Sequence, residues 1–210
     1  MSVNNITIAL PKGRIYQQVL PLLEVAGITT TEDPETSRKL KINTNINNLQ
    51  LLILRSSDVP IYVQYGVADL GIAGKDVLLE QELDGIYECL DLQIAKCKMM
   101  VAGVVGTKLP SGRIKVATKY PKITKQYFNQ LGKQTEIIKL YGAMELAPLV
   151  GLADCIVDLV ETGSTLKANN LEPWQEISPI SSQLIVNKAS MKINHVALKV
   201  LINKIRNALI

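Results

Sequence analysis

Short apolar runs alternate with segments of helical periodicity along most of the chain. Each run has the length and character of a strand buried in a parallel sheet. These runs are residues 6–10, 49–54, 70–73 and 155–159, and two further strands are expected at residues 114–118 and 135–140. A helical pattern follows the first run, with Ile15, Val19 and Leu22 at the spacing of one helix face. The alternation predicts an α/β fold with mainly parallel sheets.

The C-terminal segment, residues 191–210, has the pattern of one amphipathic helix. Its apolar stripe is expected to contain Ile193, Val196, Ala197, Val200, Leu201, Ile205 and Leu209. His195 falls on the polar side of this helix, among lysine and arginine residues. A surface histidine of this kind is usually solvated, so we do not expect it to act as a general base.

A local pattern occurs twice, 85 positions apart. Gly66 to Asp69 and Gly151 to Asp154 both read Gly-x-Ala-Asp, and each is followed by a strand and a glycine-bearing loop. The recurrence predicts two similar lobes with a cleft between them. We expect lobe I in residues 1–93, lobe II in residues 94–179, and a return to lobe I in residues 180–210. Asp69 and Asp154 precede their strands, so both are predicted to be turn residues outside the functional site.

Composition narrows the class of protein. The chain has 210 residues, of which 47% are hydrophobic, and this is enough for a substantial core. It contains neither an apolar run of membrane-spanning length nor a signal-peptide pattern, so a cytoplasmic location is expected. Three cysteines without CxxC spacing and one histidine do not favour zinc, and no metal-ligating residue is assigned. The net charge of +4 with few aromatic residues suits small polyanionic substrates better than nucleic acid.

The loop after the run 155–159 is the strongest candidate for an anion site. Its residues are Glu161, Thr162, Gly163, Ser164 and Thr165. Gly163 lets backbone N–H groups approach a ligand, and the three hydroxyls add donors, which together suit a phosphate. Asp158 and Glu161 would repel a bare phosphate, so a ligand that also carries ribose hydroxyls or Mg²⁺ is expected. Taken alone, the loop could equally be an ordinary turn between a strand and a helix.

Cations follow the predicted strands of lobe I. Lys12 and Arg14 come after the first run, Arg55 follows the second, and Lys75 follows the third. In lobe II, Glu145 and the loop 161–165 occupy comparable places. Because ligands bind beyond the carboxyl ends of parallel strands, these side chains are expected to line a site for two phosphate-bearing substrates. The alternative is that Lys12 and Arg14 are simply solvated surface residues.

No nucleophile paired with a base is visible in the sequence, so the chemistry should need no protein nucleophile. Transfer of a phosphoribosyl group to a ring nitrogen fits, because the nitrogen lone pair attacks directly. Mg²⁺ with lysine and arginine would stabilise the departing pyrophosphate. Asp158 and Glu161 would stabilise the cationic sugar.

Several long motifs, in this order, resemble ATP phosphoribosyltransferase over nearly the whole chain. They are Ala9 to Arg14, Arg55 to Pro60, Gly66 to Asp76, Glu145 to Pro148 and Asp158 to Leu166. The resemblance implies that ATP and phosphoribosyl pyrophosphate are joined through adenine N1, with Mg²⁺, in the first step of histidine biosynthesis. It also implies a periplasmic-binding-protein-like pair of lobes.

The resemblance further implies roles for individual residues. The loop from Glu161 to Thr165 is expected to hold the 5-phosphate, and Lys12, Arg14 and Arg55 are expected near the nucleotide and pyrophosphate. The length resembles the short form of the family. This form implies a homodimer within a hetero-oligomer that contains a regulatory subunit similar to histidyl-tRNA synthetase. Two alternative functions remain, namely a non-catalytic two-lobed binding module and a phosphoribosyltransferase that acts on another base.

Overall fold

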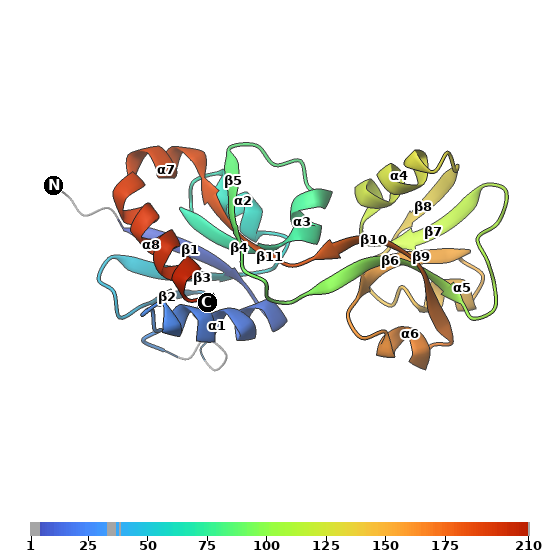
Figure 1. Cartoon of the computed structure of the whole chain (residues 1–210), viewed down its shortest axis with the longest axis horizontal. Helices are drawn as coiled ribbons and strands as arrows, with labels where there is room; N and C mark the ends of the chain where they lie inside the picture. The colour runs from blue at the N-terminus through green and yellow to red at the C-terminus, as the bar shows by residue number, and fades with distance from the viewer. Residues whose placement is uncertain (1–4, 33–36, 38, 210) are drawn as a thin grey trace. The chain divides into compact units, whose positions relative to one another are not determined.

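The computed structural model describes residues 5–32, 37 and 39–209, and the chain divides into two compact units (Figure 1). Lobe I comprises residues 1–95 and 181–210, and lobe II comprises residues 96–180. These boundaries fall within two residues of those expected from the sequence. Among the described residues, no helix combines the length and the apolar character that a membrane crossing requires.

Lobe I is built on a six-stranded sheet with the strand order β2-β3-β1-β4-β11-β5. The strands are β1 (Ile6–Pro11), β2 (Lys41–Asn43), β3 (Leu49–Leu54), β4 (Leu70–Gly74), β5 (Ile86–Asp91) and β11 (Ser182–Asn187). The helices are α1 (Arg14–Val25), α2 (Val59–Gln64), α3 (Lys75–Glu80), α7 (Lys188–Ile193) and α8 (His195–Asn207).

Helices cover both faces of this sheet, which explains why its central strands are mostly apolar. Ile8 of β1 packs in a cluster with residues of α1 and α8, whereas Ala9 faces the opposite way and packs against α2. A Cβ at Gly71 of β4 would lie 2.6 Å from a methyl group of Val63, so glycine there allows α2 to approach the sheet closely.

Lobe II is built on a five-stranded sheet with the strand order β10-β6-β9-β7-β8. The strands are β6 (Cys97–Val104), β7 (Ile114–Thr118), β8 (Thr135–Lys139), β9 (Cys155–Val160) and β10 (Leu171–Ile180). The helices are α4 (Pro121–Gln130), α5 (Leu146–Leu149) and α6 (Ser164–Ala168). Val116 of β7 faces α4, and Ala117 faces the side of the sheet that carries α5 and α6.

The sheets are mixed, so the expectation of mainly parallel sheets is wrong in this detail. The parallel pairs are β3 with β1, β1 with β4, β8 with β7, and β7 with β9. The remaining pairings between the described strands are antiparallel. Helices lie between the parallel neighbours along the chain. The antiparallel pairs involve either β2 with β3, which have no helix between them, or the strands β5, β6, β10 and β11, which flank the two passages between lobes.

The predicted repeat is present in the hydrogen bonds. Asp69 accepts the N–H of Thr7 through its carboxylate at 2.9 Å, and its own N–H donates to the Thr7 carbonyl at 2.9 Å. Asp154 makes the same two bonds to Lys115, at 2.7 and 2.8 Å. Each aspartate therefore ties the start of one strand to the start of its parallel neighbour. The prediction that both are structural turn residues is confirmed.

The C-terminal segment differs from the single amphipathic helix expected. The chain forms α7 and α8, separated at Asn194, instead of one continuous helix. Ile193, Val196 and Val200, which were expected to be buried, are 72%, 77% and 52% exposed. The buried residues of α8 are Leu198, Leu201, Ile202 and Ile205.

Candidate functional site

The cations of lobe I lie at one edge of its sheet. Lys12 and Arg14 follow β1, and Arg55 follows β3, which is its parallel neighbour. The N–H of Lys12 donates to the carbonyl of Leu54 at 2.9 Å, which brings the Lys12 backbone beside the residue that precedes Arg55. All three side chains are exposed. The strand order thus brings together the cations that the sequence predicted.

Gly13 lets the chain turn from β1 into α1 between two of these cations. It precedes the helix with φ of +86°, a conformation that a residue with a Cβ adopts only with strain. A Cβ built at this position meets no atom within 4 Å, so the backbone conformation and not crowding is what requires glycine.

Lys75 follows β4 and forms an ion pair within lobe I. Its ammonium group lies 2.8 and 2.6 Å from the two carboxylate oxygens of Glu88, on β5. Asp76 beside it is 8% exposed, and an Oδ atom of Asp76 would lie 2.2 Å from a Cβ on Gly74. Sequence reasoning missed Glu88, because its pairing with Lys75 depends on β5 being brought to this edge of the sheet.

The hydroxyl-bearing loop of lobe II is a defined turn at the carboxyl end of β9. Gly163 adopts the left-handed conformation with φ of +76°, and its carbonyl accepts the N–H of Lys167 at 3.0 Å. The hydroxyl of Thr162 donates to the Oγ of Ser164 at 3.0 Å. The side chains of Thr162, Ser164 and Thr165 are exposed, so this turn presents hydroxyl groups to solvent.

The two predicted carboxylates of this region have different surroundings. Asp158 lies within β9 and is half-buried, and its carboxylate accepts the N–H of Leu159 at 2.8 Å. Glu161, just beyond the strand, is exposed. Glu145 lies elsewhere in lobe II, half-buried at the start of α5, and its side chain does not cap that helix.

A buried hydroxyl group at the end of β7 joins several elements of lobe II. Thr118 Oγ1 donates to the carbonyl of Val157 at 2.7 Å and accepts the N–H of Tyr120 at 2.9 Å. Thr124 of α4 donates to the same oxygen at 3.4 Å. Both threonines are fully buried. The sequence places Thr118 at a strand end, but its contacts depend on β9 and α4 and were not predicted.

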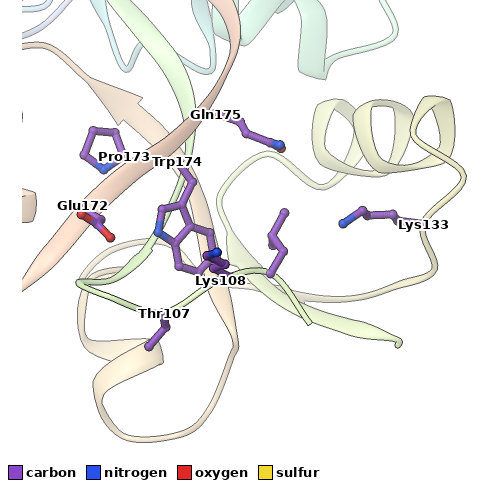
Figure 2. Close-up of a pocket in the computed structure, with 8 residues that line it drawn as sticks. Thr107, Lys108, Lys133, Glu172, Pro173, Trp174 and Gln175 are labelled. Carbon is purple, nitrogen blue, oxygen red and sulfur yellow. The ribbon is translucent and has the colours of Figure 1, made fainter. Parts of the chain in front are cut away.

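A separate open pocket of about 540 Å³ lies on lobe II (Figure 2). Its lining includes Thr107, Lys108, Lys133, Glu172 and Trp174. Because β6 runs antiparallel to β9, the loop that follows β6 lies at the end of the sheet away from residues 161–165. This pocket is therefore distinct from the predicted phosphate loop.

The family-model comparison decides the family. A model described as HisG, ATP phosphoribosyltransferase, matches residues 55–207, which is well over half of the chain. The chain belongs to the ATP phosphoribosyltransferase family. Curated ATP phosphoribosyltransferases from Ectopseudomonas mendocina and Pseudomonas savastanoi pv. phaseolicola are 59% and 58% identical to it over 203 residues. Each alignment covers 97% of this chain and 96% of the relative.

Solved structures add one match within this family and one likeness of fold. The ATP phosphoribosyl transferase (HisG:HisZ) complex from Thermotoga maritima contains a chain with a TM-score of 0.85 and 34% identity, and the match covers 97% of this chain and 98% of that one. The periplasmic aliphatic sulphonate binding protein SsuA from Escherichia coli gives a TM-score of 0.62 at 13% identity, covering 99% of this chain and 73% of that one. The second likeness concerns the fold alone, and it supports the predicted two-lobed, periplasmic-binding-protein-like architecture.

Two carboxylates of this ATP phosphoribosyltransferase chain could contact a magnesium ion. Among the described residues, no group of three or more His, Cys, Asp or Glu side chains is placed to hold a metal ion. Mg²⁺ is commonly bound through one or two carboxylates together with substrate phosphates and water. Asp158 and Glu161, which flank the end of β9, offer carboxylates of that kind.

The buried thiol of lobe II is not a candidate nucleophile. Burial, with a smaller contribution from the neighbouring charge of Asp154, raises the pKa of Cys155 to about 12. A nucleophilic cysteine needs the thiolate form, which this environment disfavours at neutral pH. Its place in ATP phosphoribosyltransferase lobe II is that of a small hydrophobic core residue.

Proposed function

We propose that the chain transfers the phosphoribosyl group of phosphoribosyl pyrophosphate to N1 of ATP, giving phosphoribosyl-ATP and pyrophosphate. This reaction is the first step of histidine biosynthesis. The observation that carries the proposal is that three cations gather at one edge of the lobe I sheet in a chain whose lobe II bears an exposed hydroxyl turn. The 59% identity to a curated ATP phosphoribosyltransferase supports it.

Lobe II binds the sugar phosphate in this proposal. The backbone N–H groups at Gly163 and the hydroxyls of Thr162, Ser164 and Thr165 receive the 5-phosphate, because this turn is already held by hydrogen bonds. Asp158 and Glu161 accept the ribose hydroxyls. Their negative charges also stabilise the positive charge that develops on the sugar as the pyrophosphate leaves.

Lobe I supplies positive charge. Lys12, Arg14 and Arg55 bind the phosphates of ATP and the departing pyrophosphate, to which arginine can donate bidentate hydrogen bonds. Lys75 has a smaller part, because its ammonium group is already paired with Glu88 and must exchange that partner to reach a substrate. Glu145 is assigned to substrate binding in lobe II.

The transfer needs no covalent intermediate with the protein. The lone pair of adenine N1 forms the new bond to C1 of the ribose while the bond from C1 to the pyrophosphate oxygen breaks, and its electron pair leaves with the pyrophosphate. When bound, Mg²⁺ supplies charge neutralisation on the pyrophosphate. The residues of the chain orient the two substrates and stabilise the separated charges, which is where most of the rate enhancement should arise.

We also propose that the chain works with a separate regulatory subunit similar to histidyl-tRNA synthetase, and that it forms a homodimer within that assembly. Support comes from the HisG:HisZ complex of Thermotoga maritima, one chain of which matches this one over 98% of its own length. A cytoplasmic location is proposed because the substrates are intracellular metabolites. Neither nucleic acid nor a membrane is needed for the reaction.

The decisive experiment is a turnover assay with the full chain, ATP, phosphoribosyl pyrophosphate and Mg²⁺, run with and without a candidate regulatory subunit. Formation of phosphoribosyl-ATP and pyrophosphate in equal amounts is expected. Saturable binding of the substrates without product would instead favour the two-lobed binding module. Product formed from another purine or pyrimidine but not from ATP would favour a phosphoribosyltransferase for a different base.

A further inference from the structure

Thr118 lies at the last paired position between β7 and β9, opposite Val157. A threonine hydroxyl has one proton to donate and two lone pairs that accept. In Thr118 all three are used, by the Val157 carbonyl, the Tyr120 N–H and the Thr124 hydroxyl. One buried oxygen therefore links β9, the turn after β7 and the helix α4.

The repeat of the chain provides an internal comparison. Thr7 and Lys115 occupy equivalent positions, because each is bound by the aspartate that starts the neighbouring strand. Three residues further along these strands, lobe II has Thr118 and lobe I has Leu10. In lobe I the pairing of β1 with β4 ends at Ala9 and Gly71, one position before Leu10. In lobe II the pairing of β7 with β9 continues to Thr118 and Val157, so the hydroxyl lies at a point where the two lobes differ.

The two lobes also differ in the segment that follows the second strand of these parallel pairs, which is β4 in lobe I and β9 in lobe II. In lobe II, Val157 directly precedes Asp158, and β9 continues into the hydroxyl turn at residues 161–165. Holding the Val157 carbonyl fixes the plane of the peptide that connects it to Asp158. The bond therefore fixes the direction in which β9 delivers Asp158 and the turn beyond it.

We propose that Thr118 is a positioning residue for the phosphoribosyl pyrophosphate site, acting through Val157 on Asp158 and on residues 161–165. The inference rests on the proposed function for its substrate. Without the hydroxyl, the Val157 carbonyl, the Tyr120 N–H and the Thr124 hydroxyl lose a partner in a buried place. Unpaired buried polar groups are costly, so the local backbone shifts to find new partners and the turn loses its fixed position.

The test compares Thr118→Val, which removes the hydroxyl at nearly constant volume, with Thr118→Ser, which keeps it. Thr44→Val is the matched control, because Thr44 is a buried threonine of lobe I whose hydroxyl donates to the Leu49 carbonyl at 3.0 Å. Thermal unfolding of each full-length variant shows how much general stability each change removes.

Hydrogen–deuterium exchange gives a readout that does not depend on turnover. In substrate-free protein, T118V is expected to speed exchange of residues 158–166 at least tenfold, with T118S and T44V within threefold of wild type. Unchanged exchange in T118V, or equal acceleration in T44V, overturns the proposal. If T118V does not fold, Thr118→Cys, whose thiol is a weak donor of similar size, replaces it, with at least fivefold acceleration expected.

Initial-rate kinetics give the second readout. T118V is expected to lower kcat/KM for phosphoribosyl pyrophosphate at least tenfold while KM for ATP changes less than twofold, and T118S is expected to restore kcat/KM to within threefold. Equal impairment of T118S and T118V would show that the hydroxyl is not responsible. A wild-type chain that makes no phosphoribosyl-ATP refutes the proposed function, whereas a normal wild type with an unimpaired T118V refutes only the positioning role.

Discussion

Replacing Gly103 with alanine should destabilise lobe II through a clash with the indole ring of Trp174. Gly103 lies on β6, and Trp174 lies on the neighbouring strand β10 at a break in register between Pro173 and Gln175. A Cβ at Gly103 would lie 2.1 Å from Cη2 and 2.2 Å from Cζ2 of the ring. Real Cβ atoms essentially never come within 3.0 Å of an atom outside their own and the neighbouring residues, so the ring must move.

The magnitude follows from two opposing effects. Overpacking of this kind usually costs about 1–3 kcal/mol of unfolding free energy. Alanine in place of a strand glycine would otherwise stabilise by roughly 0.5–1 kcal/mol, because glycine loses more backbone freedom on folding. Since Trp174 is only half-buried and has somewhere to move, the net destabilisation expected is about 1–2 kcal/mol. The sign of the change in unfolding free energy tests the explanation, because Gly103→Ala should become stabilising once the clash with the ring is removed.

Urea unfolding followed by fluorescence measures this effect directly, since Trp174 is the single tryptophan of the chain and lies in lobe II. Gly103→Ala should lower the midpoint and shift the native emission to longer wavelength as the ring leaves its position. The control is Gly103→Ala in a Trp174→Leu background, followed by circular dichroism, where it should be neutral or stabilising. The reasoning fails if Gly103→Ala costs the same in both backgrounds, or leaves stability and emission unchanged.

Three further predictions concern the site and the core. Thr165→Ala should weaken phosphoribosyl pyrophosphate binding by about 1–3 kcal/mol through one lost charge-assisted hydrogen bond, without changing thermal stability, and unchanged affinity by calorimetry would remove this residue from the site. Arg55→Ala should lower kcat more than it raises KM for ATP, whereas an effect confined to ATP affinity would assign Arg55 to nucleotide binding. Because the pKa of Cys155 is raised by burial to about 12 in the folded state, the folded protein holds its proton more tightly than the unfolded chain. The associated stability is complete below about pH 9 and falls as the pH rises toward 12, so Cys155→Ala should have a flatter alkaline stability profile, and parallel profiles would refute the assignment.

Local periodicity predicted the strands and the loops that follow them with good accuracy. The strands β1, β3, β4, β7, β8 and β9 were recognised, and most of them are central strands whose sequences are largely apolar because both faces of the sheet are covered. The Gly-x-Ala-Asp repeat was also recognisable, since its left-handed glycine and its aspartate have fixed chemical tasks in the turn. The gathering of Lys12, Arg14 and Arg55 followed from the rule for parallel strands.

Features that depend on distant parts of the chain were not predictable in this way. The buried face of α8 was only partly recognised, because Val196 and Val200 are apolar but exposed, whereas Leu201 and Ile205 are buried as expected. The antiparallel strands and the pairing of Lys75 with Glu88 depend on which strands become neighbours. The contacts of Thr118 likewise depend on tertiary packing, which no local pattern records.

The position of β11 has a consequence for the order in which the two lobes can form during synthesis. Lobe II is one continuous segment, so all of its strands have left the ribosome once residue 180 has emerged. The sheet of lobe I is incomplete at that moment, because β11, which is fully buried, inserts between β4 and β5. The edges of β4 and β5 that will pair with β11 therefore stay unpaired in the nascent chain until residues 182–187 have emerged. That interval is when lobe I is most vulnerable to wrong pairing with another chain.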